Sequence, residues 1–259
     1  MPPTRTEISD AFAQNGYAIV PHLFDRAEAQ ALKVEIRDIL ETIRHEATAA
    51  GKDPKRIADH GVSVGLAVRS SVFRQAVRDE RLLDILEVIL APNIEFLSDK
   101  AVFKSDHMTF ASPWHQDWHY WHGAHKISLW VALDDATVEN GCLKLYPGSH
   151  KAAVVHDGKA NDGHGFGHRL RPDAVDETKA VTAELEAGGA VFFHDLTLHS
   201  SHPNRSGADR WVWIPTYRDA QADDLDYSWS VAAAVVRGEG RREGEGQRVS
   251  SQKMRAMPA

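Results

Sequence analysis

The feature that most constrains the fold is a change of residue pattern near residue 94. Before it, apolar residues recur at helical spacing. After it, short runs of β-branched and aromatic residues alternate with turn signals. We expect strands at residues 94–104, 127–133, 142–146, 181–185, 190–193 and 211–216. Many short strands after a helical start predict a mainly β protein, a jelly-roll barrel with flanking helices outside.

Two helices stand out in the N-terminal region. Asp25 followed by Glu28 is typical of a capping box, and apolar residues then recur at helical spacing through residues 32–43. A second helical pattern runs through residues 82–89 and ends before Pro92.

The chain of 259 residues is long enough for one sizeable core and short for two full domains. We therefore expect a single domain over residues 1–236, with a helical part at 1–93 and a jelly-roll core at 94–220. Residues 237–259 are polar and rich in Gly, Glu and Arg, which predicts a disordered tail. The Gly- and Asp-rich stretch 157–167 reads as a loop, and the sequence leaves open whether it is a lid.

Composition excludes several classes of partner. The net charge of −7 argues against nucleic acid, and no apolar run is long enough for a membrane helix. The N-terminus lacks the apolar core of an export signal. A single cysteine, Cys142, excludes an internal disulfide and a multi-cysteine metal site, which fits a cytoplasmic protein. The oligomeric state is not readable.

The sequence Trp-His-Gln-Asp-Trp at residues 114–118 carries the main chemical signal. On a strand, residues i and i+2 point to the same side, so His115 and Asp117 can grip one ion. Two imidazoles and one carboxylate on one face of a metal are typical of non-haem iron(II) oxygenases, because this arrangement leaves positions open. Alone, the His-x-Asp pair is weak evidence, because it occurs by chance in many chains, and a polar strand end with a solvated carboxylate is the more frequent explanation.

A third ligand is expected from a distant segment. Residues 193–206 offer His194, His199 and His202, and Arg210 follows at the start of an apolar strand. An arginine there can hold a dicarboxylate through a two-pronged contact.

An ordered string of motifs over roughly residues 10 to 220 resembles the phytanoyl-CoA dioxygenase family. In chain order the motifs are His115-Gln116-Asp117, residues 129–135, Asn140-Gly141-Cys142-Leu143, Pro147-Gly148-Ser149-His150, and residues 199–206 followed by Arg210. The resemblance implies a cupin-like double-stranded β-helix that uses iron(II), the cosubstrate 2-oxoglutarate and O₂.

The resemblance also implies site residues. The family's distal metal histidine stands five residues before the motif's Asn and its 2-oxoglutarate arginine eleven residues after that histidine, which selects His199 and Arg210. Ser201 matches a hydroxyl that supports the same carboxylate, and Trp130 an aromatic beside the cosubstrate, although plain barrel packing explains Trp130 as well. A basic contact is implied on the strand before the metal motif; Lys100 fits better, and Lys104 reads as an exposed charge.

A continuing strand after His115 would aim His119 and Trp121 to the same side, so they and Trp118 are candidates for the substrate pocket. An aromatic rim with exposed histidines explains them equally well.

The activity that the resemblance implies is hydroxylation of a C–H bond of a small-molecule substrate, with release of succinate and CO₂. The retained Asp117 favours hydroxylation over halogenation. Two alternatives remain: a cupin-like hydrolase or isomerase with another divalent ion such as zinc, and a non-catalytic metal-binding barrel. The identity of the substrate and the position attacked are not readable.

Overall fold

The computed structural model describes residues 2–53, 61–105, 111–157, 166–223 and 232–241. Its strands are β1 Tyr17–Val20, β2 Val62–Val64, β3 Ile94–Lys104, β4 Lys126–Ala132, β5 Leu143–Leu145, β6 Val181–Ala183, β7 Ala190–His194, β8 His199–Ser201, β9 Arg210–Asp219 and β10 Ala234–Arg237. Its α-helices are α1 Arg5–Asn15, α2 Arg26–Ala49, α4 Leu66–Arg69, α5 Ser71–Ala76, α6 Glu80–Ile89 and α7 Trp118–Trp121. Short 3₁₀ helices are η1 Ser149–Lys151, η2 Pro172–Ala174 and η3 Glu177–Lys179.

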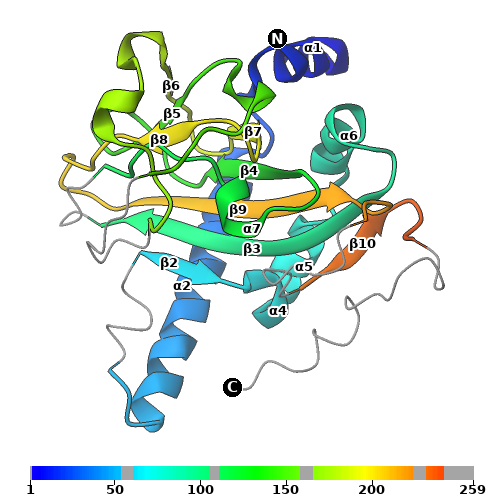
Figure 1. Cartoon of the computed structure of the whole chain (residues 1–259). Coiled ribbons are helices and arrows are strands. Elements are labelled where there is room, and N and C mark those ends of the chain that lie inside the picture. The colour runs from blue at the N-terminus through cyan, green and yellow to red at the C-terminus, as the bar shows by residue number, and fades with distance from the viewer. Residues whose placement is uncertain (1, 54–60, 106–110, 158–165, 224–231, 242–259) are drawn as a thin grey trace.

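The strands form two antiparallel sheets (Figure 1). The large sheet has the order β1-β7-β4-β9-β3-β10, with β2 also paired to β3. The small sheet has the order β6-β5-β8. This two-sheet arrangement confirms the expected jelly-roll architecture with N-terminal helices.

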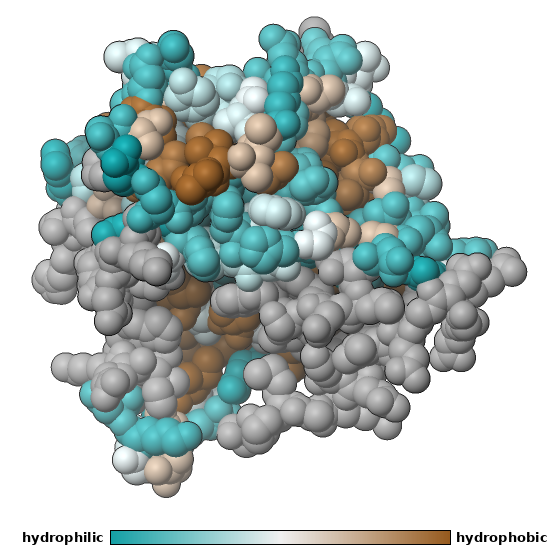
Figure 2. All heavy atoms as spheres, in the orientation of Figure 1, coloured by the Kyte–Doolittle hydropathy of each residue, from teal (hydrophilic) through white to brown (hydrophobic). Residues whose placement is uncertain are grey.

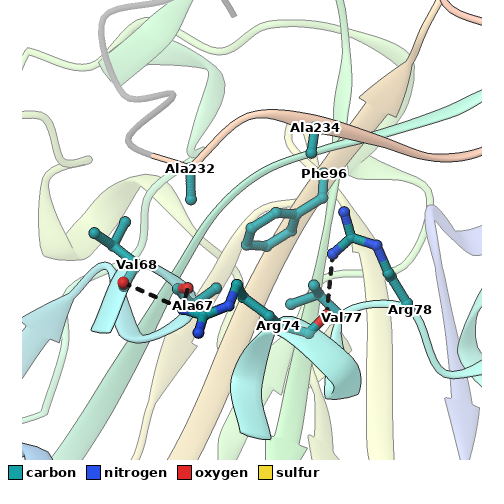
Figure 3. Close-up of a pocket in the computed structure, with 8 residues that line it drawn as sticks. All are labelled: Ala67, Val68, Arg74, Val77, Arg78, Phe96, Ala232 and Ala234. Atoms are coloured by element: carbon teal, nitrogen blue, oxygen red, sulfur yellow. Dashed lines mark hydrogen bonds between the residues drawn. The ribbon is translucent and has the colours of Figure 1, made fainter. Parts of the chain in front are cut away.

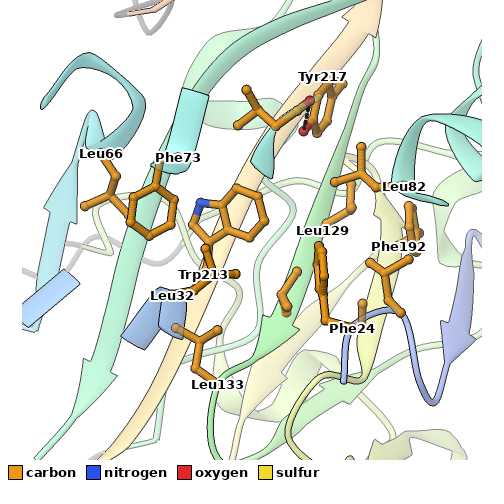
Figure 4. Close-up of a cluster of buried hydrophobic side chains, with 14 of the residues drawn as sticks. Phe24, Leu32, Leu66, Phe73, Leu82, Leu129, Leu133, Phe192, Trp213 and Tyr217 are labelled. Atoms are coloured by element: carbon orange, nitrogen blue, oxygen red, sulfur yellow. Dashed lines mark hydrogen bonds between the residues drawn. The ribbon is translucent and has the colours of Figure 1, made fainter. Parts of the chain in front are cut away.

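Alternation along the strands gives the large sheet two apolar faces. On β9, Trp211 and Trp213 face the helices, whereas Val212 and Ile214 face the small sheet. The helix side holds the larger core, in which Trp213 lies beside Phe73 (Figure 4). The side chains between the two sheets, including Arg210, belong to the interior that carries the candidate site.

The two predicted helices are confirmed. Helix α2 begins with the capping box of Asp25 and Glu28, and α6 ends at Ile89 ahead of Pro92. All six predicted strands are present, with ends shifted by a few residues. The chain also forms β1, β2, β8 and β10, which the sequence did not predict. These are three or four residues long, and their partner strands define them, as Tyr17 opposite Phe193 shows for β1.

The C-terminal part of the described chain differs from the expected tail. Arg237 lies in β10 and forms ion pairs with Glu80, Asp84 and Glu87. Residues 239–241 remain attached to the domain. The amide of Glu239 donates to Asn93 Oδ1, and the amide of Arg241 donates to the carbonyl of Ala220. The tail prediction for residues 242–259 falls outside the described residues.

The described surface is mixed in hydropathy, and the helix side has a small pocket. Figure 2 shows a largely hydrophilic described surface, with apolar areas in its upper half and further ones in its lower half. A small pocket lies between α4, α5, β3 and β10, lined by Phe96, Arg74 and Arg78 among others (Figure 3). Both arginines donate to backbone carbonyls there. Within the described residues, no helix has the length and apolar character needed to cross a membrane.

Candidate metal centre

The structure brings His115, Asp117 and His199 together between the two sheets, with ligand atoms within 4.8 Å of one another. His115 Nε2 lies 3.6 Å from Asp117 Oδ1, and His199 Nε2 lies 3.8 Å from the same oxygen. All three residues are buried. Two imidazole nitrogens and one carboxylate oxygen therefore face a common point.

A two-residue backbone ladder joins the histidines. The amide of His115 donates to the carbonyl of His199, and the amide of His199 donates to the carbonyl of His115, each at 3.0 Å. This pairing fixes the imidazole rings side by side, with centroids 4.1 Å apart. The distant segment thus supplies the third group, as the sequence indicated.

The hydrogen bonds on the far side of each ring orient the histidines for metal binding. Nδ1 of His115 lies 2.9 Å from the carbonyl of Pro113, and Nδ1 of His199 lies 2.9 Å from that of Thr197. A carbonyl can only accept, so each Nδ1 carries the proton and each Nε2 keeps its lone pair for the centre. Burial lowers the pKa of His199 to about 4, so the ring is neutral near pH 7.

Asp117 reaches the centre for a different reason from the one expected. Its φ of −65° and ψ of −29° are helical, and it precedes α7, so the chain turns after His115 instead of continuing as a strand. Burial raises the pKa of Asp117, but His199, His115 and Lys100 outweigh burial and hold it well below the usual range. The carboxylate is therefore ionised, as a metal ligand must be.

Because the chain turns, the predicted substrate-pocket residues diverge. His119 Nε2 donates to the carbonyl of Val154, and Trp121 Nε1 donates to Asp195 Oδ2. Trp118 Nε1 donates to the carbonyl of Gly123. The expectation that His119 and Trp121 point with His115 is therefore wrong, because it assumed strand alternation where the structure has a helix.

Two other aromatic rings lie beside His115. The ring centroids of Tyr120 and Phe166 are 6.2 Å and 5.0 Å from that of His115. Phe166 follows the part of the 157–167 stretch that lies outside the described residues, so the lid question stays open. The only sequence signal for Phe166 was its place beside a glycine-rich loop.

Arg210 lies at the start of β9 and is almost fully buried, with 1% of its surface exposed. Within the described residues, its Nε and Nη1 have no hydrogen-bond partner. Burial lowers the pKa of Arg210 to about 10, which still leaves the guanidinium charged. A buried cation with two unused donors is costly unless an anion completes it, so this group fits a carboxylate ligand.

Three neighbours surround this guanidinium. Trp130 lies under it, with the guanidinium carbon 5.1 Å from the ring centroid. Lys104, opposite Arg210 on β3, is buried and donates to Ser201 Oγ at 2.8 Å. Burial and Arg210 lower the pKa of Lys104 to about 7. The reading of Lys104 as an exposed charge is therefore wrong, because β3 is covered on both faces here.

Lys100 lies on the same face of β3 and is half-buried. It acts on the metal centre rather than on Arg210, since its charge helps to lower the pKa of Asp117 and of His199. The remaining candidate histidines lie elsewhere: His202 Nε2 contacts Thr182 Oγ1, and His194 belongs to a separate group with Asp195. Asp195 follows the end of β7, which stops short of His199.

The candidate centre is also held from outside. Gln116, fully buried, donates to the carbonyls of Ala152 and Leu196 and accepts from the amide of Val154. Trp114 Nε1 donates to Glu177 Oε1. Trp114 and Gln116, the neighbours of His115, thus hydrogen-bond to loops that follow later in the chain and hold them next to the centre.

Comparison with known proteins points the same way as the geometry. The profile of the family described as phytanoyl-CoA dioxygenase (PhyH) matches residues 12–212. L-proline trans-4-hydroxylase from Streptomyces griseoviridis is 29% identical over 233 residues, covering 80% of this chain and 83% of that protein. A solved structure titled non-heme monooxygenase ThoJ, in the apo form, superposes with a TM-score of 0.73 at 24% identity, covering 94% of this chain and 89% of the other.

A second solved structure contains the cofactors. The epimerase SnoN, from nogalamycin biosynthesis, was solved in complex with Fe³⁺, α-ketoglutarate and nogalamycin RO. It superposes with a TM-score of 0.68 at 18% identity, covering 90% of this chain and 98% of the other.

Proposed function

Because this chain belongs to the phytanoyl-CoA dioxygenase family of iron- and 2-oxoglutarate-dependent oxygenases, we propose that it hydroxylates a C–H bond of a small-molecule substrate. The observation that carries the proposal is that the space between the two sheets contains both a set of metal ligands and a buried arginine that can bind a carboxylate. His115, Asp117 and His199 converge with their lone pairs free, and the buried Arg210 has two unused donors in the described structure.

Each protein ligand contributes a defined property to the proposed centre. His115 and His199 would bind iron through Nε2, because their Nδ1 protons are held by backbone carbonyls. Asp117 supplies the negative charge, and Lys100 helps to keep it ionised. Three ligands on one side leave the opposite positions open for the cosubstrate and O₂. Bound iron with 2-oxoglutarate and O₂ supplies the oxidising chemistry, and succinate and CO₂ are its by-products.

The cosubstrate's far carboxylate would be held at the other end of the interior. Arg210 keeps donors on Nε and Nη1 without a partner among the described residues, and a buried guanidinium with unused donors is suited to bind a carboxylate. Ser201 Oγ accepts from Lys104 Nζ and from the amide of Ser112, and it also contacts Ser112 Oγ. Ser201 would therefore support this end of the site by holding Lys104 in place beside Arg210. Trp130 supports the guanidinium from below.

The side of the centre next to His115 is proposed as the substrate side. Tyr120 and Phe166 place aromatic rings against His115, and they would exclude water from the reacting position. We do not assign this role to Trp118, His119 or Trp121, because their side-chain N–H groups donate to the Gly123 carbonyl, the Val154 carbonyl and the Asp195 carboxylate.

The chain retains the carboxylate Asp117, which favours hydroxylation over a reaction that needs halide in that position. The comparison with an L-proline hydroxylase over most of both chains makes amino acids and their cyclic derivatives the first substrates to try. Within the described residues, no feature of the site favours hydrolysis, which would not need a contact for 2-oxoglutarate at Arg210.

The test is succinate release by the metal-loaded enzyme, with L-proline, other cyclic amino acids and a branched acyl-CoA thioester as separate substrates. We expect one of them to stimulate succinate release in an iron-dependent manner and to gain one oxygen atom in the mass spectrum. A product of unchanged mass, or one that has lost two hydrogens, would overturn hydroxylation. Turnover of any substrate without 2-oxoglutarate would overturn the oxygenase assignment for this chain.

A further inference from the structure

A second group of potential metal ligands lies beside the first. His125, His194 and Asp195 bring a ligand atom each to within 4.8 Å of one another. Nδ1 of His125 and Nδ1 of His194 lie 3.0 Å and 3.1 Å from the same oxygen, Asp195 Oδ1. The candidate iron centre uses none of these three residues.

The strand pairing of the large sheet builds this group. His125 precedes β4, whereas His194 ends β7 and pairs across the sheet with Ile127. The amide of Asp195 then donates to the carbonyl of Lys126. Strand register therefore fixes all three residues, which is the rigidity that a built ligand set requires.

Asp195 is a buried carboxylate, and its two oxygens have different surroundings. Its side chain is fully buried. Oδ2 accepts from Trp121 Nε1 and from the amide of Lys126, each at 3.0 Å. Within the described residues, Oδ1 contacts the two imidazoles, and Nδ1 of His125 donates to it. This oxygen is the one available to a cation.

The hydrogen bonds leave the contact between His194 and Asp195 unsatisfied. His194 Nδ1 accepts the amide proton of Leu196 at 3.1 Å, so that nitrogen carries no proton of its own. The single lone pair of Nδ1 is used in that bond, and no proton lies between Nδ1 and Asp195 Oδ1, which are 3.1 Å apart. Burial lowers the pKa of His194 to about 4, which keeps its ring neutral. An ion bound to Asp195 Oδ1 would offset the repulsion between these two atoms, and it would take the place of the Leu196 amide proton at His194 Nδ1.

This group is open to solvent on one side and has another histidine, His150, nearby. The side chain of His125 is about half exposed (52%), so an ion can enter from solvent and retain water ligands there. On the inner side, the ring centroid of His150 lies 5.8 Å from that of His194. Nδ1 of His150 is buried and has no hydrogen-bond partner within the described residues.

We propose that His125, His194 and Asp195 form a second divalent-metal site, of the class that takes zinc. Two imidazoles and one carboxylate are a usual zinc ligand set, with water or a further histidine in the fourth position. The hydrogen bond to Asp195 raises the pKa of His125, so metal binding would release the proton from its Nδ1. The site would be structural, because the carbonyl of Asp195 accepts the amide of Trp118, the residue after Asp117. An ion bound to Asp195 would thereby stiffen the turn that presents the iron-binding carboxylate.

The experiment uses full-length protein without an affinity tag, stripped of metal and titrated with Zn²⁺ by calorimetry and with Co²⁺ by visible absorption. We expect two equivalents to bind to the wild type and one to His115→Ala, in which only the second site is intact. His125→Ala should lose the other equivalent or weaken it at least tenfold, since even the loss of a supporting group costs about 10–100-fold in affinity. The double variant should bind neither equivalent.

Two further variants make the outcome decisive. His194→Gln tests the same site from β7, and His45→Ala removes a histidine on α2 whose side chain is 79% exposed and should change nothing. Circular dichroism and melting temperature establish that each variant is folded. A His115→Ala protein that binds no equivalent, or a second equivalent that survives both His125→Ala and His194→Gln, would overturn the proposal. Neither result bears on the first centre.

Discussion

At the scale of single residues, the position of a proton decides what the centre can do. His115 and His199 each donate Nδ1–H to a backbone carbonyl two residues before them in the chain. This repeated local contact leaves Nε2 as the free nitrogen on both rings. A sequence shows which residues are histidines, but it does not show which ring nitrogen faces the metal.

His115→Ala and His199→Ala are expected to lose iron binding and turnover, because each removes one of three ligands. His202→Ala is the matched control: it shares the same segment, and its ring contacts Thr182 rather than the centre. Iron content after anaerobic loading, followed by activity, checks the prediction. If His202→Ala lost iron while His199→Ala kept it, the ligand assignment would be refuted.

Arg210→Ala is expected to raise the 2-oxoglutarate requirement while iron binding stays nearly intact. Removing one partner of a buried charge pair costs about 2–5 kcal/mol, which corresponds to more than a tenfold change in affinity. Binding of 2-oxoglutarate to the iron-loaded protein without O₂ is the measurement. Arg205→Ala, an exposed arginine nearby, is the control. An unchanged 2-oxoglutarate affinity would remove Arg210 from the site.

The site was predictable from sequence where a motif fixed the spacing, and not where the reasoning relied on an assumed conformation. The motif string identified the three residues that the structure brings together. Strand alternation misdirected His119 and Trp121, because the helical φ and ψ of Asp117 turn the chain. Lys104 was misjudged for a related reason: its burial depends on β8, whose Ser201 it contacts.

At the scale of elements, the long and strongly periodic segments were predictable and the short ones were not. Helix α2 has 24 residues and β3 has 11, and both carry their own signal in composition and capping. Strand β10 has four residues, and its order depends on pairing with β3. Four residues are too few to show a clear strand periodicity, so the sequence alone does not predict β10 within a polar segment.

Truncation tests where the domain ends. Ending the chain after Arg241 is expected to leave stability unchanged, because residues 242–259 contain few apolar residues. Ending it after Ala233 removes β10 and the ion pairs of Arg237, which we expect to cost about 2 kcal/mol. The melting temperature should then fall by roughly 4–8 °C. Equal melting temperatures for the two truncations would show that β10 contributes nothing.

At the scale of the whole molecule, one buried carboxylate joins the helical layer to the large sheet. Asp99, on β3, is 1% exposed. It accepts from the amide of Ala67 in α4 and from Trp213 Nε1 on β9. Trp213 in turn packs against Phe73 of α5 (Figure 4). These contacts make the charge of Asp99 a property of the fold as a whole.

The acid dependence of stability should report this carboxylate. Burial raises the pKa of Asp99 to about 6, although the hydrogen bonds from Ala67 and Trp213 oppose the shift. A folded-state pKa above the unfolded value means that the folded protein binds a proton first on acidification. The contribution of Asp99 to stability is therefore largest below the unfolded value and is lost as pH rises through about 6.

We predict that lowering the pH from 7.5 to 5 stabilises the wild type relative to Asp99→Asn by about 1 kcal/mol, because pH 5 lies about one pKa unit below the folded value. Both free energies of unfolding would be measured by denaturant titration at each pH, and only their difference is interpreted, since other groups titrate equally in both proteins. Asp173→Asn, an exposed carboxylate on η2, should track the wild type at both values. A difference between wild type and Asp99→Asn that stays constant, or moves in the opposite direction, would show that Asp99 is ionised in the folded protein throughout this range, and that the junction between the layers tolerates a buried charge.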